Sequence, residues 1–152
     1  MDAEGYIKVF PRAPGASLDN LLIFSPFSLS SFKITGRLKD IIIRGGENIH
    51  PLEIENILFA HPLIAEASAV GLKDSHYGEV VAVFIIPKSS PTAPRITPTE
   101  VRQWVMEKLS GHLVPKYVFF VEGYPKTASG KIMKYVLRED GERLVKEGKG
   151  VE

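Results

Sequence analysis

Apolar residues gather in two β-branched runs near the middle of the chain. Residues 64–72 and 79–87 are rich in Ile, Val and Ala, and the polar, glycine-containing segment 73–78 separates them. Runs of this length and composition, bounded by turn residues, are typical of strands. We therefore predict two neighbouring strands at the centre of a sheet, with a third strand over residues 117–122.

Three segments show the spacing of amphipathic helices. The first begins at Pro51, which is placed as a first-turn proline, and ends near residue 61. A second helix is expected to start at Thr97, because Thr97 and Glu100 are capping residues. A third helix is expected from residue 134 to about 147, followed by a frayed tail over residues 148–152.

A β-hairpin is expected over residues 41–49. Three consecutive isoleucines are followed by the turn sequence RGGE and by a short return strand. Glycine adopts positive φ at no steric cost, and a tight glycine tip lets the backbone approach a ligand closely. Together with the other elements, this pattern indicates an α+β fold: a hairpin plus a small three-stranded mixed sheet flanked by helices.

Composition narrows the functional classes. The chain has 152 residues and 44% apolar content, enough for one domain with one core. Its net charge of +1 offers no bulk field for nucleic acid or an anionic membrane. It has no cysteine, and its four histidines lack ligand-like spacing, so no metal site is expected. Without a long apolar run, we expect no membrane span and an intracellular, cytoplasmic protein.

The strongest candidate for chemistry is Lys131, at the end of the segment 125–131, which reads PKTASGK. Small residues and glycine make this loop flexible, and the long lysine stem can carry its ammonium toward an anion such as phosphate. Without other motifs, such a loop is more often a solvated turn.

Further motifs resemble one family. GRLKD at 36–40 leads into the isoleucine run, and RGGEN at 44–48, PLEIE at 51–55, VGLKD at 70–74 and VPKY at 114–117 precede PKTASGK. In this order they resemble the C-terminal lid domain of the acyl-adenylate-forming (AMP-binding) superfamily. That superfamily holds acyl-CoA synthetases, firefly luciferases and non-ribosomal peptide adenylation domains, and the resemblance is nearest to the acyl-CoA synthetases.

The resemblance also implies domain boundaries. Residues 1–9 resemble a remnant of the inter-domain strand, and residues 35–147 correspond to the lid domain. The intervening residues 10–34 are atypical for the family, and their three prolines, five serines and four phenylalanines show no period. We expect an irregular excursion there, either a genuine surface insertion or translated intron sequence.

In the resembled enzymes, the lysine that matches Lys131 reaches between the substrate carboxylate and the α-phosphate of ATP. Its role would be to relieve negative charge in the transition state. Arg37 matches a contact to the nucleotide ribose. Lys39 matches the hinge about which the lid turns; the alternative is a solvated strand-edge lysine.

The same resemblance places Gly45, Gly46 and Glu47 beside the pantetheine arm of CoA once the lid has turned. The alternative is a well-formed turn without a ligand. Asn48 agrees with the RGGEN pattern of acyl-CoA synthetases and favours fatty or aryl acids as substrates.

Three other polar residues receive no catalytic role. Glu53 and Glu55 are expected on a solvated helix face, since their spacing points them to different sides of the helix. His112 is assigned no function, because a lone histidine is usually structural.

The sequence contains neither a Ser/Thr/Gly-rich phosphate loop nor the Tyr-x-Thr-Gly-Asp segment of the family's large N-terminal domain. The first hypothesis is therefore the lid of an ATP-dependent acid:CoA ligase, inactive alone and completed by an adenylation domain in cis or trans. ATP or AMP with Mg²⁺, and CoA, would bind only in that complete enzyme.

The second hypothesis is a stand-alone, non-catalytic module that docks on or regulates an adenylating partner in trans. A third is a superfamily member that serves a carrier protein or oxidises luciferin. The identity of the acid and of the acceptor, the oligomeric state, and whether the chain is a fragment or a separate gene product stay open.

Overall fold

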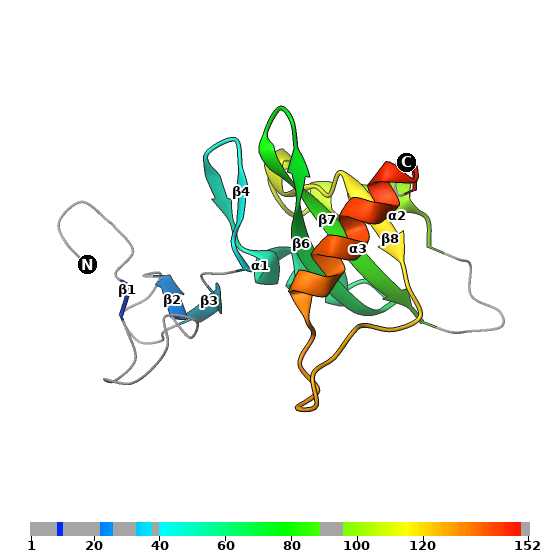
Figure 1. Cartoon of the computed structure of the whole chain (residues 1–152), viewed down its shortest axis with the longest axis horizontal. Helices are drawn as coiled ribbons and strands as arrows, with labels where there is room; N and C mark the ends of the chain where they lie inside the picture. The colour runs from blue at the N-terminus through cyan, green and yellow to red at the C-terminus, as the bar shows by residue number, and fades with distance from the viewer. Residues whose placement is uncertain (1–8, 11–21, 26–32, 38–39, 89–95, 150–152) are drawn as a thin grey trace.

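The computed structural model of the protein describes residues 9–10, 22–25, 33–37, 40–88 and 96–149 (Figure 1). Its centre is a five-stranded sheet built around a long antiparallel pair, β6 (Ile64–Asp74) and β7 (Gly78–Pro87). β6 pairs with one edge of β7 over nearly its whole length. β8 (Tyr117–Phe120) runs parallel to β7 on the other edge, so the sheet is mixed. The three strands predicted from the sequence are confirmed.

The hairpin of β4 (Ile42–Arg44) and β5 (Glu47–Ile49) joins the same edge of β7 as β8. Arg44 pairs with Gly78, so the hairpin attaches where β7 begins, and β8 lies farther along that edge. The hairpin, the mixed sheet and the flanking helices confirm the predicted α+β class.

Three helices begin where the sequence predicts them: α1 (Pro51–Phe59), α2 (Pro98–Met106) and α3 (Lys134–Lys146). At the start of α2, the Thr97 hydroxyl accepts a hydrogen bond from the Glu100 N–H at 3.3 Å. The Glu100 carboxylate in turn accepts the Thr97 N–H at 2.8 Å. This reciprocal capping box satisfies two N–H groups that the helix leaves unpaired.

The sheet separates two buried clusters because successive side chains of β7 point to opposite faces. The odd-numbered residues 81, 83 and 85 pack with α1 and α2, whereas the even-numbered residues 80, 82 and 84 pack with α3. Figure 1 shows α3 crossing one face of β6 and β7. Since both faces are covered, β7 is apolar at consecutive positions, unlike a half-exposed strand.

α3 approaches the sheet closely at Gly141, which is buried. A Cβ at this position would come within 2.9 Å of Leu72 Cδ2 and 3.3 Å of Phe84 Cζ. A glycine in the middle of a helix weakens it by about 1 kcal/mol relative to alanine. Here the missing side chain is what lets the helix lie against the sheet.

The expectation that Glu55 lies on a solvated face is wrong. Glu53 is exposed, but Glu55 is only 9% exposed and points toward β6. A carboxylate tolerates burial when it is paired and hydrogen-bonded, and Glu55 meets both conditions. Its Oε1 accepts the Ala69 N–H at 2.8 Å and lies 2.7 Å from the Lys134 ammonium.

Within residues 10–34, for which the sequence suggests an irregular excursion, the structure describes one short strand and parts of two others. β2 (Leu22–Ser25) lies inside it and pairs antiparallel with β1 (Val9–Phe10) and β3 (Lys33–Arg37). The apolar run in β2 is too short to produce a period across the whole segment. Pairing with the strands on either side supplies backbone hydrogen bonds that the apolar pattern of β2 alone does not reveal.

Two kinds of feature are absent from the described part of the chain. No helix there combines the length and the apolar character needed to cross a bilayer. No group of three or more His, Cys, Asp or Glu side chains is arranged there to hold a metal ion.

Candidate functional site

Lys131 lies in a loop that is stabilised by its own backbone hydrogen bonds. The bridge between Lys126 and Ile132 closes the base of the loop, together with a hydrogen bond from the Met133 N–H to the Pro125 carbonyl at 2.9 Å. Inside, the Thr127 N–H donates to the Lys131 carbonyl at 2.8 Å. The loop therefore folds back on itself, with Lys131 on its returning side.

Small polar residues at the tip of this loop supply its remaining hydrogen bonds. The Thr127 hydroxyl accepts the Lys131 N–H at 3.2 Å and shares a hydrogen bond of 2.9 Å with the Ser129 hydroxyl. Gly130 has a φ of +79°, a conformation that L-residues with side chains rarely adopt. Thr127 and Ser129 thus supply hydrogen bonds within the loop, and Gly130 adopts the backbone conformation that the turn requires.

The Lys131 side chain is exposed, and its ammonium takes part in none of the ion pairs that the described part of the chain forms. An exposed ammonium on a short, internally bonded loop can approach an anion held by another surface. A buried ion pair would have prevented this.

The chain enters the lysine loop through Tyr124, which is anchored to the sheet. Its hydroxyl donates to the Phe84 carbonyl at 2.8 Å. Burial raises the pKa of the Tyr124 phenol, and the Glu66 and Glu55 carboxylates raise it further, so the phenol stays protonated as a donor. Nearby, the Lys126 ammonium lies 3.7 Å from the Glu66 carboxylate on the exposed surface.

The second predicted site, the hairpin tip, has the expected geometry. Gly45 and Gly46 have φ of +58° and +88°, as a two-residue turn with two left-handed positions requires. The Gly45 N–H donates to the Tyr77 carbonyl at 2.7 Å, which ties the tip to the turn between β6 and β7. A Cβ on Gly46 would meet nothing within 4 Å, so the outer side of the tip is open.

Arg44 fastens this tip to two other segments. Its guanidinium donates to the His112 carbonyl at 2.6 Å and lies 4.9 Å from the centre of the Tyr77 ring. The His112 imidazole is 3.7 Å from the Glu47 carboxylate. His112, to which the sequence assigned no role, therefore contacts the hairpin from the 3₁₀ turn η3 (Gly111–Leu113). No local sequence signal links residues this far apart.

The turn between β6 and β7 is held by Asp74. Its carboxylate accepts the backbone N–H groups of His76 and Tyr77 at 2.9 Å and 3.0 Å and pairs with the Lys116 ammonium at 2.6 Å. The Lys116 ammonium, followed by these two N–H donors, holds the pKa of Asp74 well below its usual range. The turn that bonds to the hairpin tip is thus itself held by two hydrogen bonds and an ion pair.

The two predicted sites lie at opposite ends of β7. The hairpin tip attaches at Gly78, whereas the lysine loop leaves from β8 beside Ile85, where the Val121 N–H donates to the Ile85 carbonyl. Ile85 follows Gly78 by seven positions along the strand, roughly 23 Å at about 3.3 Å per residue. Figure 1 shows the hairpin and the loop before α3 projecting from opposite ends of the domain.

Two of the predicted site residues have no described side chain. Arg37 is the last residue of β3, of which the structure describes the backbone path. Lys39 lies outside the described residues. The structure therefore brings Gly45, Gly46 and Glu47 together and separates them from Lys131.

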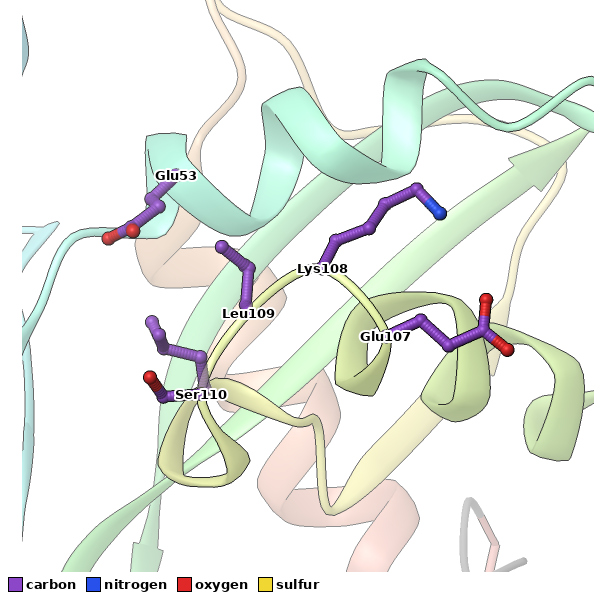
Figure 2. Close-up of a pocket in the computed structure, with 6 residues that line it drawn as sticks. Glu53, Glu107, Lys108, Leu109 and Ser110 are labelled. Atoms are coloured by element: carbon purple, nitrogen blue, oxygen red, sulfur yellow. The ribbon is translucent and has the colours of Figure 1, made fainter.

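A shallow depression of about 480 Å³ lies between the start of α1 and the segment after α2. Figure 2 shows Glu53, Lys108 and Ser110 around it. The Lys108 ammonium is 3.4 Å from the centre of the Trp104 ring. Neither Lys131 nor the hairpin tip lines this depression, so both predicted sites are open surfaces rather than walls of this cavity.

The chain is similar in sequence to known acyl-CoA ligases. The acyl-CoA ligase SID4 of Ajellomyces capsulatus is 50% identical over 121 residues, covering 75% of this chain and 20% of that protein. The medium-chain acyl-CoA ligase ACSF2, mitochondrial, of Mus musculus is 47% identical over 114 residues, covering 75% of this chain and 18% of that protein. The chain thus spans about a fifth of the length of these curated relatives.

Solved structures show the same fold. The Mycobacterium tuberculosis fatty acyl CoA synthetase superposes with a TM-score of 0.69 and 32% identity, over 80% of this chain and 24% of that one. Residues 53–131 match the family model of the AMP-binding enzyme C-terminal domain, which is 79 of the 152 residues. The chain therefore belongs to the AMP-binding enzyme C-terminal domain family, whose members include the C-terminal parts of acyl-CoA ligases.

Proposed function

We propose that this chain is the mobile lid of an ATP-dependent acid:CoA ligase and that it works with a large adenylation domain in cis or trans. The observation that carries the proposal is the placement of two distinct loops at opposite ends of β7, where their attachment points are roughly 23 Å apart. One orientation of a lid cannot present both ends to the same reacting atoms. A lid that turns between two half-reactions can present each in sequence.

In the first half-reaction, a carboxylate oxygen of the acid attacks the α-phosphorus of ATP. The bond to the bridging oxygen breaks, and pyrophosphate leaves with its electron pair. Negative charge gathers on the oxygens around phosphorus, and the Lys131 ammonium offsets it. The exposed position of this ammonium and the internally bonded loop beneath it support this role.

In the second half-reaction, the sulfur of CoA attacks the acyl carbonyl of the acyl-adenylate, AMP leaves, and the thiol proton passes to solvent. Gly45 and Gly46 would lie along the pantetheine arm, where the absence of a Cβ allows close backbone approach. Lys39 would be the hinge and Arg37 a contact to the ribose, both on the strength of the family motif alone.

Lys131→Ala in the complete enzyme tests the proposal. We expect pyrophosphate release with acid and ATP to fall by about 100-fold or more, in the range that loss of one electrostatic group costs. Thioester formation from pre-made acyl-adenylate and CoA should change by less than about threefold. Equal loss in both half-reactions would refute the assignment of Lys131 to adenylation.

The chain alone should form no acyl-CoA from acid, ATP with magnesium, and CoA, because the nucleotide floor and the acyl pocket belong to the partner domain. Adding a lid-less adenylation domain separates the two hypotheses of function. Restored turnover supports a lid that acts in trans, whereas docking without restored turnover supports a regulatory module.

A further inference from the structure

Lys134, the first residue of α3, sits where helix energetics disfavour a cation. The N-terminus of a helix carries partial positive charge, which favours acidic side chains in the first turn. The first turn of α3 contains no acidic residue, and Lys134 follows Lys131 by three positions. Local helix preference therefore does not account for this lysine.

Its ammonium instead reaches a fixed acceptor on the sheet. It lies 2.7 Å from Glu55 Oε1 and 3.2 Å from the Ala69 carbonyl. The lysine and glutamate side chains are only 20% and 12% exposed. Glu55 is itself held in place, because the same oxygen accepts the Ala69 N–H at 2.8 Å. Lys134 thus docks on a carboxylate that β6 has already oriented.

This pair occupies the open edge of β6. In an antiparallel pair, the N–H and C=O of one residue point to the same side. Both groups of Ala69 bond to side chains, the N–H to Glu55 and the C=O to Lys134. A purely structural role would be edge protection, since covering these groups shields an edge strand from pairing with another chain.

The position of the pair along the chain points to more than edge protection. The lysine loop has two stems, and each is tied to a different strand of the same sheet. Tyr124 anchors the entering stem to β7, and Lys134 anchors the leaving stem to β6 through Glu55 and Ala69. The loop is held together by internal hydrogen bonds. Anchoring both of its stems to the sheet therefore determines the position of Lys131.

We propose that Glu55 and Lys134 are positioning residues that hold the Lys131 loop in place for adenylation. This inference rests on the proposed function of Lys131. Misplacement of a reacting group by about 1 Å can cost on the order of 100-fold in rate. Loss of the anchor of one stem should reduce the adenylation rate by less than this, because Tyr124 still anchors the other stem.

The test uses the complete enzyme with Lys134→Met and, as a milder change, Glu55→Gln, which keeps an acceptor for the Ala69 N–H. We expect adenylation to fall by about tenfold in Lys134→Met and thioester formation to change by less than about twofold. Lys134→Arg should recover most of the adenylation rate. The matched control is Lys116→Met, which breaks the 2.6 Å pair with Asp74 at the other end of β7 and should leave adenylation unchanged.

A purely structural role would lower both half-reactions together, and that result would overturn the proposal. The Lys131→Ala variant shows whether such a result contradicts the positioning role alone or the proposed function as well. If Lys131→Ala does not distinguish the half-reactions, the proposed function fails. If it does, but Lys134→Met lowers both equally, only the positioning role fails. When both proposals hold, Lys134→Met adds almost no further loss to Lys131→Ala.

A second measurement does not depend on activity. Hydrogen exchange of residues 125–133 reports on the Lys131 N–H, which bonds to the Thr127 hydroxyl. We expect exchange in this segment to be faster in Lys134→Met and Glu55→Gln than in the parent and in Lys116→Met. Unchanged exchange in a folded Glu55→Gln protein would overturn the positioning role, even if Lys134→Met fails to fold.

Discussion

The backbone N–H of Gly45 donates to the carbonyl of Tyr77 at 2.7 Å, across 32 residues of sequence. This bond makes the hairpin tip and the turn between β6 and β7 one surface. It leaves the other glycine of the tip, Gly46, open on its outer side. The two glycines therefore differ in role: Gly45 attaches the tip to the neighbouring turn, and Gly46 leaves the backbone accessible to a ligand.

Replacing Gly46 tests the access role. Its φ of +88° strains any side chain, so we expect Gly46→Ala to lower the free energy of unfolding by about 1–2 kcal/mol. In the complete enzyme, thioester formation should fall while adenylation is retained, measured as separate half-reactions. Gly46→Asn is the matched variant, because asparagine tolerates left-handed backbone but still carries a Cβ. Full thioester activity in Gly46→Asn would contradict close approach by CoA.

Gly141→Ala tests the packing of α3 on the sheet. Alanine would strengthen the helix by about 1 kcal/mol, but its Cβ would lie 2.9 Å from the buried Leu72 side chain. Overpacking costs about 1–3 kcal/mol, so we expect a net loss of stability in urea denaturation. A stabilised protein would show that α3 can move away from the sheet. Adding Leu72→Val should recover part of the loss if the clash is its cause.

His61 should make stability depend on pH. Its Nδ1 accepts the Leu63 N–H at 3.1 Å, and its ring packs edge-on against Trp104. Burial lowers the pKa of His61 below its ordinary value of 6.5; Glu100 opposes this shift, and Lys108 and Lys88 add to it. The unfolded chain therefore takes up the proton first as the pH falls.

Stability from His61 is fully present above pH 6.5 and is lost as the pH falls from there through the lower pKa of the folded state. We expect the free energy of unfolding in urea to be smaller at about pH 5.5 than at about pH 7.5. His61→Asn should reduce that difference. An unchanged difference would assign the pH dependence to other groups.

Lys116→Met should raise the pKa of Asp74 without restoring its ordinary value. The Lys116 ammonium is the largest cause of the lowered pKa, but the Tyr77 and His76 N–H groups would still favour the carboxylate. Since the folded pKa is depressed, the stabilisation is present above about pH 4 and lost on acidification. An NMR titration of the Asp74 carboxyl carbon measures the shift. A pKa at or above the ordinary value would show that the turn had opened.

Local pattern predicted most of the fold. Thr97 with Glu100 marked the start of α2, and two apolar runs indicated the neighbouring central strands β6 and β7. The pattern did not indicate β2, whose apolar run is short and lies among proline- and serine-rich residues. It failed at Glu55, because spacing on one helix does not show which carboxylate meets a partner on another element.

By itself, the sequence determined the order of the elements from residue 41 onward, the α+β class and the family, since periodicity, capping residues and ordered motifs are local properties. It also singled out Lys131 and the glycine tip. Only the tertiary structure decided that these two sites lie at opposite ends of β7 and that Lys134 meets Glu55, 79 residues away. Strand register and helix packing set such distances, and both arise from contacts between segments far apart in the chain.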